Sequence, residues 1–389
     1  MADVHLGARH DDLGPAAAAQ RERQFAAFHR SVELALEEKV DAVLICGDLF
    51  DSNSQPKRSV ERAASELARL VERHIPVVLI PGTHDCYDPA SIYRAFDLPA
   101  LAGATADEVV VLSDKRPRVE FANLEMTVTG FVFPTKRAPH SPLAGFQVEQ
   151  ADGSGDSPRR QKWQVGMIHG SMAVPGRFDT DEVAFTEQEV AASGLDYLAL
   201  GHWHSHRKGT AGKTTWAYPG APEPVALDQD GAGQVLLVDL NGRNGQLSIV
   251  VTPRTVGRTK IEKLELDAAG IASQADLERS LRERADADTV LDVKLVGVRP
   301  DVLDLHVDEL ERQLQDGFLR LRIRDASAVA LPDGPLPPAD TILGAFARDF
   351  GARIVDHESR GDDERAAELR EALRLGVLLL DDPQRVTLA

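Results

Sequence analysis

The sequence predicts an α/β fold followed by a smaller α+β domain. Three observations support this prediction. Strand-length apolar runs alternate with amphipathic helical segments in the first hundred residues, which indicates parallel strands joined by helices. Short alternating runs between residues 109 and 133 indicate antiparallel strands. After Pro253 the helices and strands become shorter, so we expect a first domain at residues 1–253 and a second at residues 254–389.

The first domain shows the alternation most clearly. Phe25, Phe28, Val32 and Leu36 recur at helical spacing, which predicts a helix whose apolar face packs on a sheet. The Gly-, Ser- and Asp-rich stretch 151–158 predicts a loop. The expected helices are 20–39, 59–73 and 186–193, and the expected strands are 40–45, 77–80, 163–168, 197–200, 216–218, 234–240 and 247–251.

The second domain is expected to alternate helices and short strands. A Pro-rich turn at residues 332–338 separates its two parts. The expected helices are 275–283, 303–314, one containing Ile342 to Phe350, and 363–380, and the expected strands are 291–295 and 319–323.

Composition narrows the function classes. A net charge of −18 argues against a protein that binds nucleic acid through a generally basic surface, so a phosphate-bearing substrate would need metal ions or local basic patches. Two cysteines make no disulfide framework, and neither a membrane span nor a signal segment is evident. We therefore expect a cytoplasmic protein without a membrane partner.

Five segments place metal-binding residue types at a predicted strand end or in the loop after it. Parallel strands bring such ends to one edge of a sheet, where ligands bind. Carboxylates and imidazoles together suit Mn²⁺, Fe²⁺ or Zn²⁺ better than Mg²⁺ alone, and two ions roughly 3.5–4 Å apart need a shared carboxylate, for which we choose Asp48. The segments are Asp3-Val4-His5, Gly47-Asp48-Leu49-Phe50-Asp51, Gly82-Thr83-His84-Asp85, His169-Gly170 and Gly201-His202-Trp203-His204.

Each segment alone has a simpler explanation as a surface histidine or a capping aspartate. Five of them in equivalent positions make that explanation improbable. Asp3 and His5 have no strand-forming residues before them, so we expect the strand beneath this pair to be nearly missing. Asp51, three residues after Asp48, is expected to fix the loop or a ligand rather than to bind metal.

These segments, in this order, resemble the signature of calcineurin-like metallophosphoesterases, and residues 2–7 with 47–51 resemble the SbcD-type DNA repair exonuclease branch. The resemblance covers residues 1 to about 250. It implies a sandwich of two mixed β-sheets flanked by helices, with the smaller C-terminal α+β domain as a cap. It also implies two divalent metal ions, of which Mn²⁺ is our choice, and hydrolysis of a phosphodiester.

The same resemblance implies a role for each residue. One metal would be held by Asp3, His5, Asp48 and His204, and the other by Asp48, Thr83, His169 and His202. His84 would protonate the leaving oxygen, and Asp85 would orient the imidazole of His84. The sequence departs from the family pattern at Thr83, where the family has asparagine; because a neutral hydroxyl is a weaker ligand than an amide oxygen, we expect the second metal to be held more loosely.

Three neighbouring residues are candidates for substrate binding. Trp203 could stack on a base, or it could pack beneath the ligand loop. His206 and Arg207 could contact phosphate, or they could belong to a solvated loop.

We therefore expect a metal-dependent DNA exonuclease or endonuclease acting in DNA repair. One alternative is a phosphodiesterase for a small nucleotide or phosphoester. Another, suggested by Thr83, is a weakly active scaffold subunit for an ATPase. The family resemblance further implies homodimerisation and a coiled-coil ATPase partner.

Overall fold

The computed structural model describes residues 1–148, 162–173, 183–226, 229, 231–243, 246–299, 303, 305–329 and 337–381. The chain divides into two compact units, Met1–Thr259 and Lys260–Ala389. The expected boundary after residue 253 falls inside strand β13, and the first unit keeps that whole strand. The predicted loop at 151–158 lies outside the described residues.

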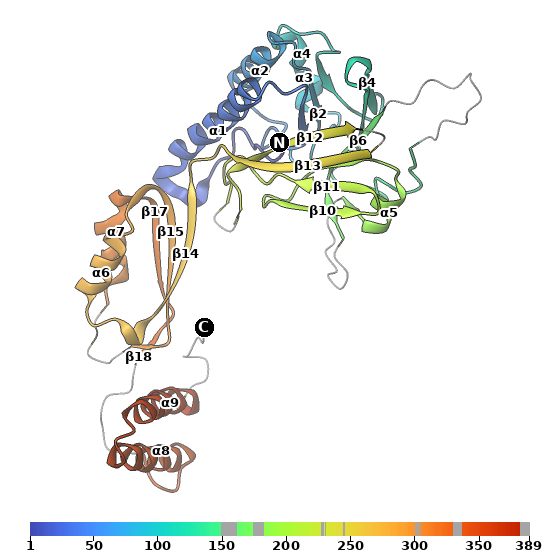
Figure 1. Ribbon diagram of the computed structural model, residues 1–389. Helices are drawn as coiled ribbons and strands as arrows, with labels where there is room; N and C mark the ends of the chain where they lie inside the picture. The colour runs from blue at the N-terminus through green and yellow to red at the C-terminus, as the bar shows by residue number, and fades with distance from the viewer. Residues whose placement is uncertain are drawn as a thin grey trace. The chain divides into compact units, whose positions relative to one another are not determined.

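In the first unit, helices pack on two main β-sheets, of which the smaller is parallel and the larger is mixed (Figure 1). Its helical elements are η1 (Asp11–Ala16), α1 (Ala17–Glu37), α2 (Lys57–Val71), α3 (Ile92–Ala95), α4 (Leu98–Leu101), η2 (Ala122–Leu124) and α5 (Glu187–Ala192). Its strands are β1 (Val43–Cys46), β2 (Val77–Ile80), β3 (Val109–Val111), β4 (Arg118–Phe121), β5 (Met126–Phe131), β6 (Trp163–His169), β7 (Ser171–Met172), β8 (Ala184–Phe185), β9 (Tyr197–Gly201), β10 (Arg207–Ala211), β11 (Thr214–Tyr218), β12 (Gln234–Arg243) and β13 (Gln246–Thr255).

The smaller sheet has the order β1-β2-β3 and is parallel throughout. Alternate residues of a strand face opposite sides of a sheet, and β2 shows the consequence. Val77 and Leu79 pack with Phe28 of α1 and Leu67 of α2, as the predicted apolar stripe requires. Val78 and Ile80 belong to a different apolar cluster on the other face. This sheet is therefore buried on both sides.

The larger sheet has the order β10-β11-β9-β6-β5-β4 and is mixed. One face contributes Val165 and Met167 of β6 to the cluster that also holds Val78, so the two sheets pack face to face. Ile168, on the other face, packs with Val190 of α5. The unit is thus a sandwich of two sheets with helices outside, as the sequence predicts.

One strand prediction needs correction. Antiparallel pairing is present between β4 and β5, but β3 pairs in parallel with β2, with Val109 opposite Val77. The run Val109–Val111 is wholly apolar and largely buried, which is typical of a parallel strand covered on both sides. Strand β10 is largely exposed and carries little apolar signal, which explains why the sequence pattern missed it.

The second unit, taken by itself, has a parallel sheet of order β14-β15-β17 with α6 and α7 on one face. Leu291, Val293 and Leu295 of β15 form its core. Helices α8 and α9 pack against each other in a hairpin. The elements are β14 (Lys260–Asp267), η3 (Ala268–Gly270), α6 (Gln274–Arg282), β15 (Asp286–Val296), β16 (Val298–Arg299), α7 (Val307–Leu314), η4 (Gln315–Gly317), β17 (Phe318–Asp325), β18 (Ala328–Val329), α8 (Ile342–Ser359) and α9 (Asp363–Asp381).

In the part of the chain that the structure describes, no helix is both long enough and apolar enough to cross a membrane. Cys46 and Cys86 are both free and buried, and Cys46 is part of the core between the sheets.

Candidate metal centre

The N-terminal segment is held beside β1 by main-chain hydrogen bonds. Asp3 N donates to Gly47 O over 3.1 Å, and His5 N donates to Asp48 O over 2.9 Å. Leu6 forms an isolated parallel bridge with Phe50. Asp3 and His5 are therefore fixed next to Asp48 by the backbone, even though the segment that carries them forms no longer strand.

Four of the predicted ligands adopt a left-handed backbone. The φ angle is 56° at Asp3, 50° at His5, 51° at Asp48 and 98° at His202. For residues other than glycine this conformation costs roughly 1–3 kcal/mol, and it concentrates at functional sites. His10, Lys39, His74 and Glu125 outside the cluster share this conformation, so the left-handed backbone accompanies the cluster without identifying it.

Asp48 lies at the centre of the cluster and is buried. Its Oδ1 accepts a 2.8 Å hydrogen bond from the main-chain N–H of His84. Its Oδ2 lies 3.0 Å from His169 Nε2 and 3.7 Å from His5 Nε2. One oxygen is thus fixed by the backbone, while the other faces two imidazoles.

The imidazole of His169 is oriented by the protein. Its Nδ1 donates to the carbonyl oxygen of Cys46 over 2.9 Å, because a carbonyl can only accept. In the neutral ring Nε2 therefore carries a lone pair, and this buried atom has no hydrogen-bond partner among the described residues. Burial lowers the pKa of His169, but the carboxylates of Asp48 and Asp3 more than offset it and raise the pKa to about 10.

The other imidazoles close around the same space. His5 Nε2 lies 3.2 Å from His204 Nε2, and His204 Nε2 lies 3.7 Å from Asp3 Oδ1. The amide N–H of His202 donates to both oxygens of Asp3, at 2.9 and 3.1 Å, and the ring of His202 stands edge-on to that of His169. The pKa of His204 falls to about 3, first because the ring is buried and then because His5 is close.

Three groups of possible ligand atoms lie within 4.8 Å of one another: Asp3 with His5 and His204, Asp3 with Asp48 and His169, and His5 with Asp48 and His84. Among the described residues, His202 takes part in none of these groups. Thr83 is buried between Gly82 and His84. The assignment of His202 and Thr83 as ligands remains a prediction.

Two glycines permit this close packing. A Cβ on Gly47, where φ is 83°, would come 2.3 Å from His169 Nδ1. A Cβ on Gly82 would come 2.2 Å from Asp48 Oδ1. Both contacts are far inside van der Waals distance, so a side chain at either position would displace a predicted ligand.

His84 is the most accessible member of the cluster, with 49% of its side chain exposed. Its Nδ1 donates to the main-chain oxygen of Asp51 over 2.9 Å, which leaves Nε2 free at the open side. Asp51 also lies 3.3 Å from His5 Nδ1 through Oδ1. Asp51 therefore fixes two histidines, one through its carbonyl and one through its carboxylate, in line with the supporting role predicted for it.

The prediction that Asp85 orients His84 is wrong. The Asp85 side chain is buried and points into the protein, where Oδ1 accepts from Gly82 N (2.7 Å) and Oδ2 accepts from Phe50 N (3.1 Å) and Tyr93 Oη (2.5 Å). It therefore ties the loop after β2 to the loop after β1. Asp85 follows His84 in the sequence, but this gives no sign that its side chain points into the protein. Nothing in the sequence identified Tyr93 as its partner.

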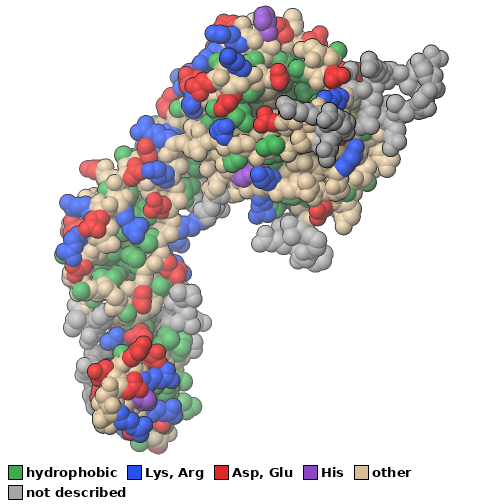
Figure 2. Space-filling model, in the orientation of Figure 1, with side chains coloured by type: hydrophobic (Ala, Val, Ile, Leu, Met, Phe, Trp, Pro, Cys, Tyr) green, Lys and Arg blue, Asp and Glu red, His purple; other side chains and the backbone are tan. Residues whose placement is uncertain are grey.

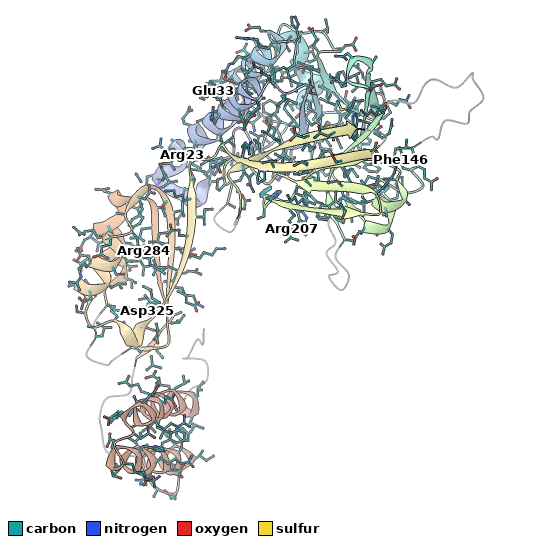
Figure 3. The ribbon with its side chains drawn as sticks, in the orientation of Figure 1. Arg23, Glu33, Phe146, Arg207, Arg284 and Asp325 are labelled. Carbon is teal, nitrogen blue, oxygen red and sulfur yellow. The ribbon has the colours of Figure 1, made fainter. Side chains whose placement is uncertain are left out.

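Trp203 packs within the ligand loops. Its Nε1 donates to Ser171 Oγ over 2.7 Å, and its ring stacks on Tyr218 with centroids 5.6 Å apart. The guanidinium of Arg207, labelled in Figure 3, lies 4.1 Å from the centre of the Trp203 ring. His206 Nδ1 donates a hydrogen bond to Tyr218 O, because a carbonyl oxygen can only accept. These contacts favour the packing role of Trp203 over base stacking.

The donor set fits divalent metal ions. Buried carboxylate oxygens and imidazole nitrogens face one another at 3.0 to 3.7 Å, and the lone pair of His169 Nε2 is directed at a carboxylate. Two acceptors in such contact repel unless a proton or a cation lies between them. The raised pKa of His169 indicates that a proton can take this place on His169 Nε2, and metal binding would displace that proton.

Comparison with known proteins shows the family of the chain. Residues 1–206 match the model of calcineurin-like phosphoesterases. The DNA double-strand break repair protein Mre11 of Sulfolobus acidocaldarius is 38% identical in an alignment of 397 positions, gaps included, that covers 95% of this chain and 96% of that protein. Mre11 of Aeropyrum pernix is 32% identical, covering 65% of this chain and 60% of that protein. The uncharacterized metallophosphoesterase YhaO of Bacillus subtilis is 26% identical, covering 64% and 57%.

The extent of these matches differs. The chain matches about 60% of the length of the A. pernix and B. subtilis relatives and nearly the whole length of the S. acidocaldarius protein.

Proposed function

Because the chain belongs to the calcineurin-like phosphoesterase family, we propose that it is a Mn²⁺-dependent phosphodiesterase that cleaves DNA. The observation that supports this most directly is Asp48, whose buried Oδ2 faces the imidazoles of His169 and His5. A carboxylate in this position suits a bridge between two cations.

The proposed ligand sets are those that the family resemblance implies. Asp3, His5, Asp48 and His204 would hold one ion, and Asp48, Thr83, His169 and His202 would hold the other. When bound, the ions lower the pKa of a coordinated water and offset negative charge on the phosphoryl group. Cys46 O and Asp51 hold the far nitrogens of His169 and His5, so both rings present Nε2 to the centre.

His84 is the proposed general acid. Because its Nδ1 donates to Asp51 O, the proton available for transfer is the one on Nε2 of the imidazolium form. The exposed position of the ring lets it reach the leaving oxygen of a bound substrate. A general acid typically contributes about 10²–10⁴-fold to the rate.

DNA is proposed as the substrate because two of the relatives are named as DNA double-strand break repair proteins. Acidic and basic side chains are interspersed over the face shown in Figure 2, so attraction of a polyanion depends on the bound cations and not on a generally basic surface. We assign the unit Lys260–Ala389 to selection of DNA ends, and a dimer with a coiled-coil ATPase partner remains an expectation from the family.

The experiment is a Mn²⁺-dependent digestion of single-stranded, blunt-ended and hairpin DNA by the full chain. Asp48→Asn should abolish cleavage and reduce Mn²⁺ binding below two equivalents. Asp107→Asn is the matched control, since Asp107 is a surface residue that pairs with Arg116, and it should change neither. A wild-type chain that binds fewer than two Mn²⁺ ions and cleaves neither DNA nor a model diester would refute the proposal.

Thr83 supports a second candidate, in which the chain is a weakly active scaffold subunit for an ATPase. A hydroxyl at the expected amide position offers the second ion a poorer ligand. One bound Mn²⁺ per chain without measurable hydrolysis would favour this candidate. Hydrolysis of small phosphodiesters with no cleavage of DNA would instead favour a nucleotide phosphodiesterase.

A further inference from the structure

The two histidine loops after β6 and β9 are connected by Trp203, which lies in a predicted ligand segment, and by Tyr218, which belongs to none. Tyr218, the last residue of β11, is buried to 1% exposure and is one of the largest fully buried side chains among the described residues. Its hydroxyl donates to Gly170 O over 2.9 Å and accepts from Met172 N over 3.0 Å. Both partners follow His169 closely, so Tyr218 fixes the loop that leaves this ligand.

The same residue also holds the other loop. Its ring stacks on Trp203 with an interplanar angle of 26°, and Trp203 is the residue between His202 and His204. Its main-chain oxygen accepts a 2.9 Å hydrogen bond from His206 Nδ1. One residue therefore contacts both loops, through its hydroxyl on one side and its ring and carbonyl on the other.

Trp203 closes this arrangement. Its Nε1 donates to Ser171 Oγ over 2.7 Å, so the loop after β9 is bonded directly to the loop after β6. The guanidinium of Arg207 lies over the Trp203 ring, 4.1 Å from its centroid. We call Tyr218, Trp203 and Ser171 the aromatic bracket.

We propose that Tyr218 is a positioning residue that sets the spacing between His169 and the pair His202 and His204 through the aromatic bracket. This inference rests on the proposed function, since it gives these histidines the role of metal ligands. Supporting groups around metal ligands affect the metal because small displacements of a ring nitrogen weaken the bond it makes. In this proposal Tyr218 acts on the histidines through the loops that carry them.

The test is Tyr218→Phe in the full chain, with Mn²⁺ binding measured by titration. The substitution keeps the ring stacked on Trp203 and removes both hydroxyl hydrogen bonds. We expect Mn²⁺ affinity to fall by about 10–100-fold. We also expect the exchange-coupled two-manganese signal in electron paramagnetic resonance to weaken and to return at higher Mn²⁺ concentration.

Two further variants separate positioning from a general effect on folding. Tyr197→Phe removes a hydroxyl from another buried tyrosine of the same sheet, at the opposite end of β9 from the histidines, and should leave Mn²⁺ binding unchanged. Trp203→Phe keeps an aromatic ring against Tyr218, removes the bond to Ser171 and should also weaken Mn²⁺ binding.

Wild-type affinity and an unchanged two-manganese signal in Tyr218→Phe would overturn the inference, whether or not the wild-type chain cleaves DNA. Equal losses in Tyr197→Phe and Tyr218→Phe would overturn it too, because the effect would then be general. A wild-type chain that binds Mn²⁺ with the expected signal but cleaves no diester would refute the proposed activity. The Mn²⁺ titration of Tyr218→Phe would still decide whether the aromatic bracket positions the histidines.

Discussion

Replacing Asp85 tests whether this residue supports the structure or serves His84. In Asp85→Ala, the amides of Gly82 and Phe50 and the hydroxyl of Tyr93 lose their common acceptor. Asp85 is fully buried, and leaving a buried donor without a partner costs about 1–3 kcal/mol. The bond from Phe50 is buried and those from Gly82 and Tyr93 are half-buried, so we expect a loss of about 2–4 kcal/mol in the free energy of unfolding.

Asp85→Asn should cause a smaller loss in the free energy of unfolding than Asp85→Ala. The amide keeps one acceptor oxygen, and Tyr93 can turn its hydroxyl to accept, so one main-chain N–H is left without an acceptor. Burial raises the pKa of Asp85, so the neutral amide also avoids burying a charge. We therefore expect Asp85→Asn to cost about 1–3 kcal/mol, less than Asp85→Ala.

The assay is urea-induced unfolding in EDTA, which removes any contribution of bound metal to the measured stability. Tyr93→Phe is the matched control, since it removes one of the three donors, and its effect should not add fully to that of Asp85→Asn because the two residues share a bond. A loss below about 1 kcal/mol in Asp85→Ala, with an altered pH dependence of hydrolysis, would show that Asp85 acts on His84 after all.

The remaining predictions concern the metal site. Thr83→Asn should tighten the weaker Mn²⁺ binding step and raise hydrolysis, and an unchanged titration would show that position 83 is no ligand. Gly47→Ala should weaken Mn²⁺ binding by about 10–100-fold, because its Cβ would meet His169 Nδ1 at 2.3 Å; wild-type binding would contradict the packing described. In EDTA, thermal stability should fall as pH rises from about 6.5 towards 10, since the folded pKa of His169 is raised to about 10, and the lowered pKa of Asp48 should make stability fall again below about pH 4. Saturating Mn²⁺ should remove the loss at high pH, and a flat profile in EDTA would contradict the His169–Asp48 pairing.

The sequence predicted the alternating helices and strands and the ligand cluster because both depend on local pattern, whereas the sandwich of two sheets was implied by the family resemblance. Apolar periodicity identified α1, α2 and β2, and strand ends followed by ligand-type residues identified Asp48 and His169. Whether a strand is parallel depends on its neighbours in space, which is why β3 was misjudged. The direction of the Asp85 side chain depends on amides from two distant loops, which no local pattern contains.

The tyrosines that support the ligand loops could not be predicted from local sequence pattern either. Nothing in the sequence distinguishes Tyr93 and Tyr218 from other tyrosines, and their importance comes from the loops they join. Left-handed backbone at Asp3, His5 and Asp48 is equally invisible in residue types, although a glycine next to a ligand is a usable sign of close packing.

The carboxylates proposed as metal ligands also join the ligand loops to one another. Asp3 accepts the amide of His202, and Asp48 accepts the amide of His84, so each joins the loop it belongs to with another ligand loop. These bonds use backbone donors and need no cation. The strained backbone at Asp3 and Asp48 is therefore offset by contacts within the protein. It follows that a weak metal site at Thr83 would reflect the ligand itself and not a failure of the loops to assemble.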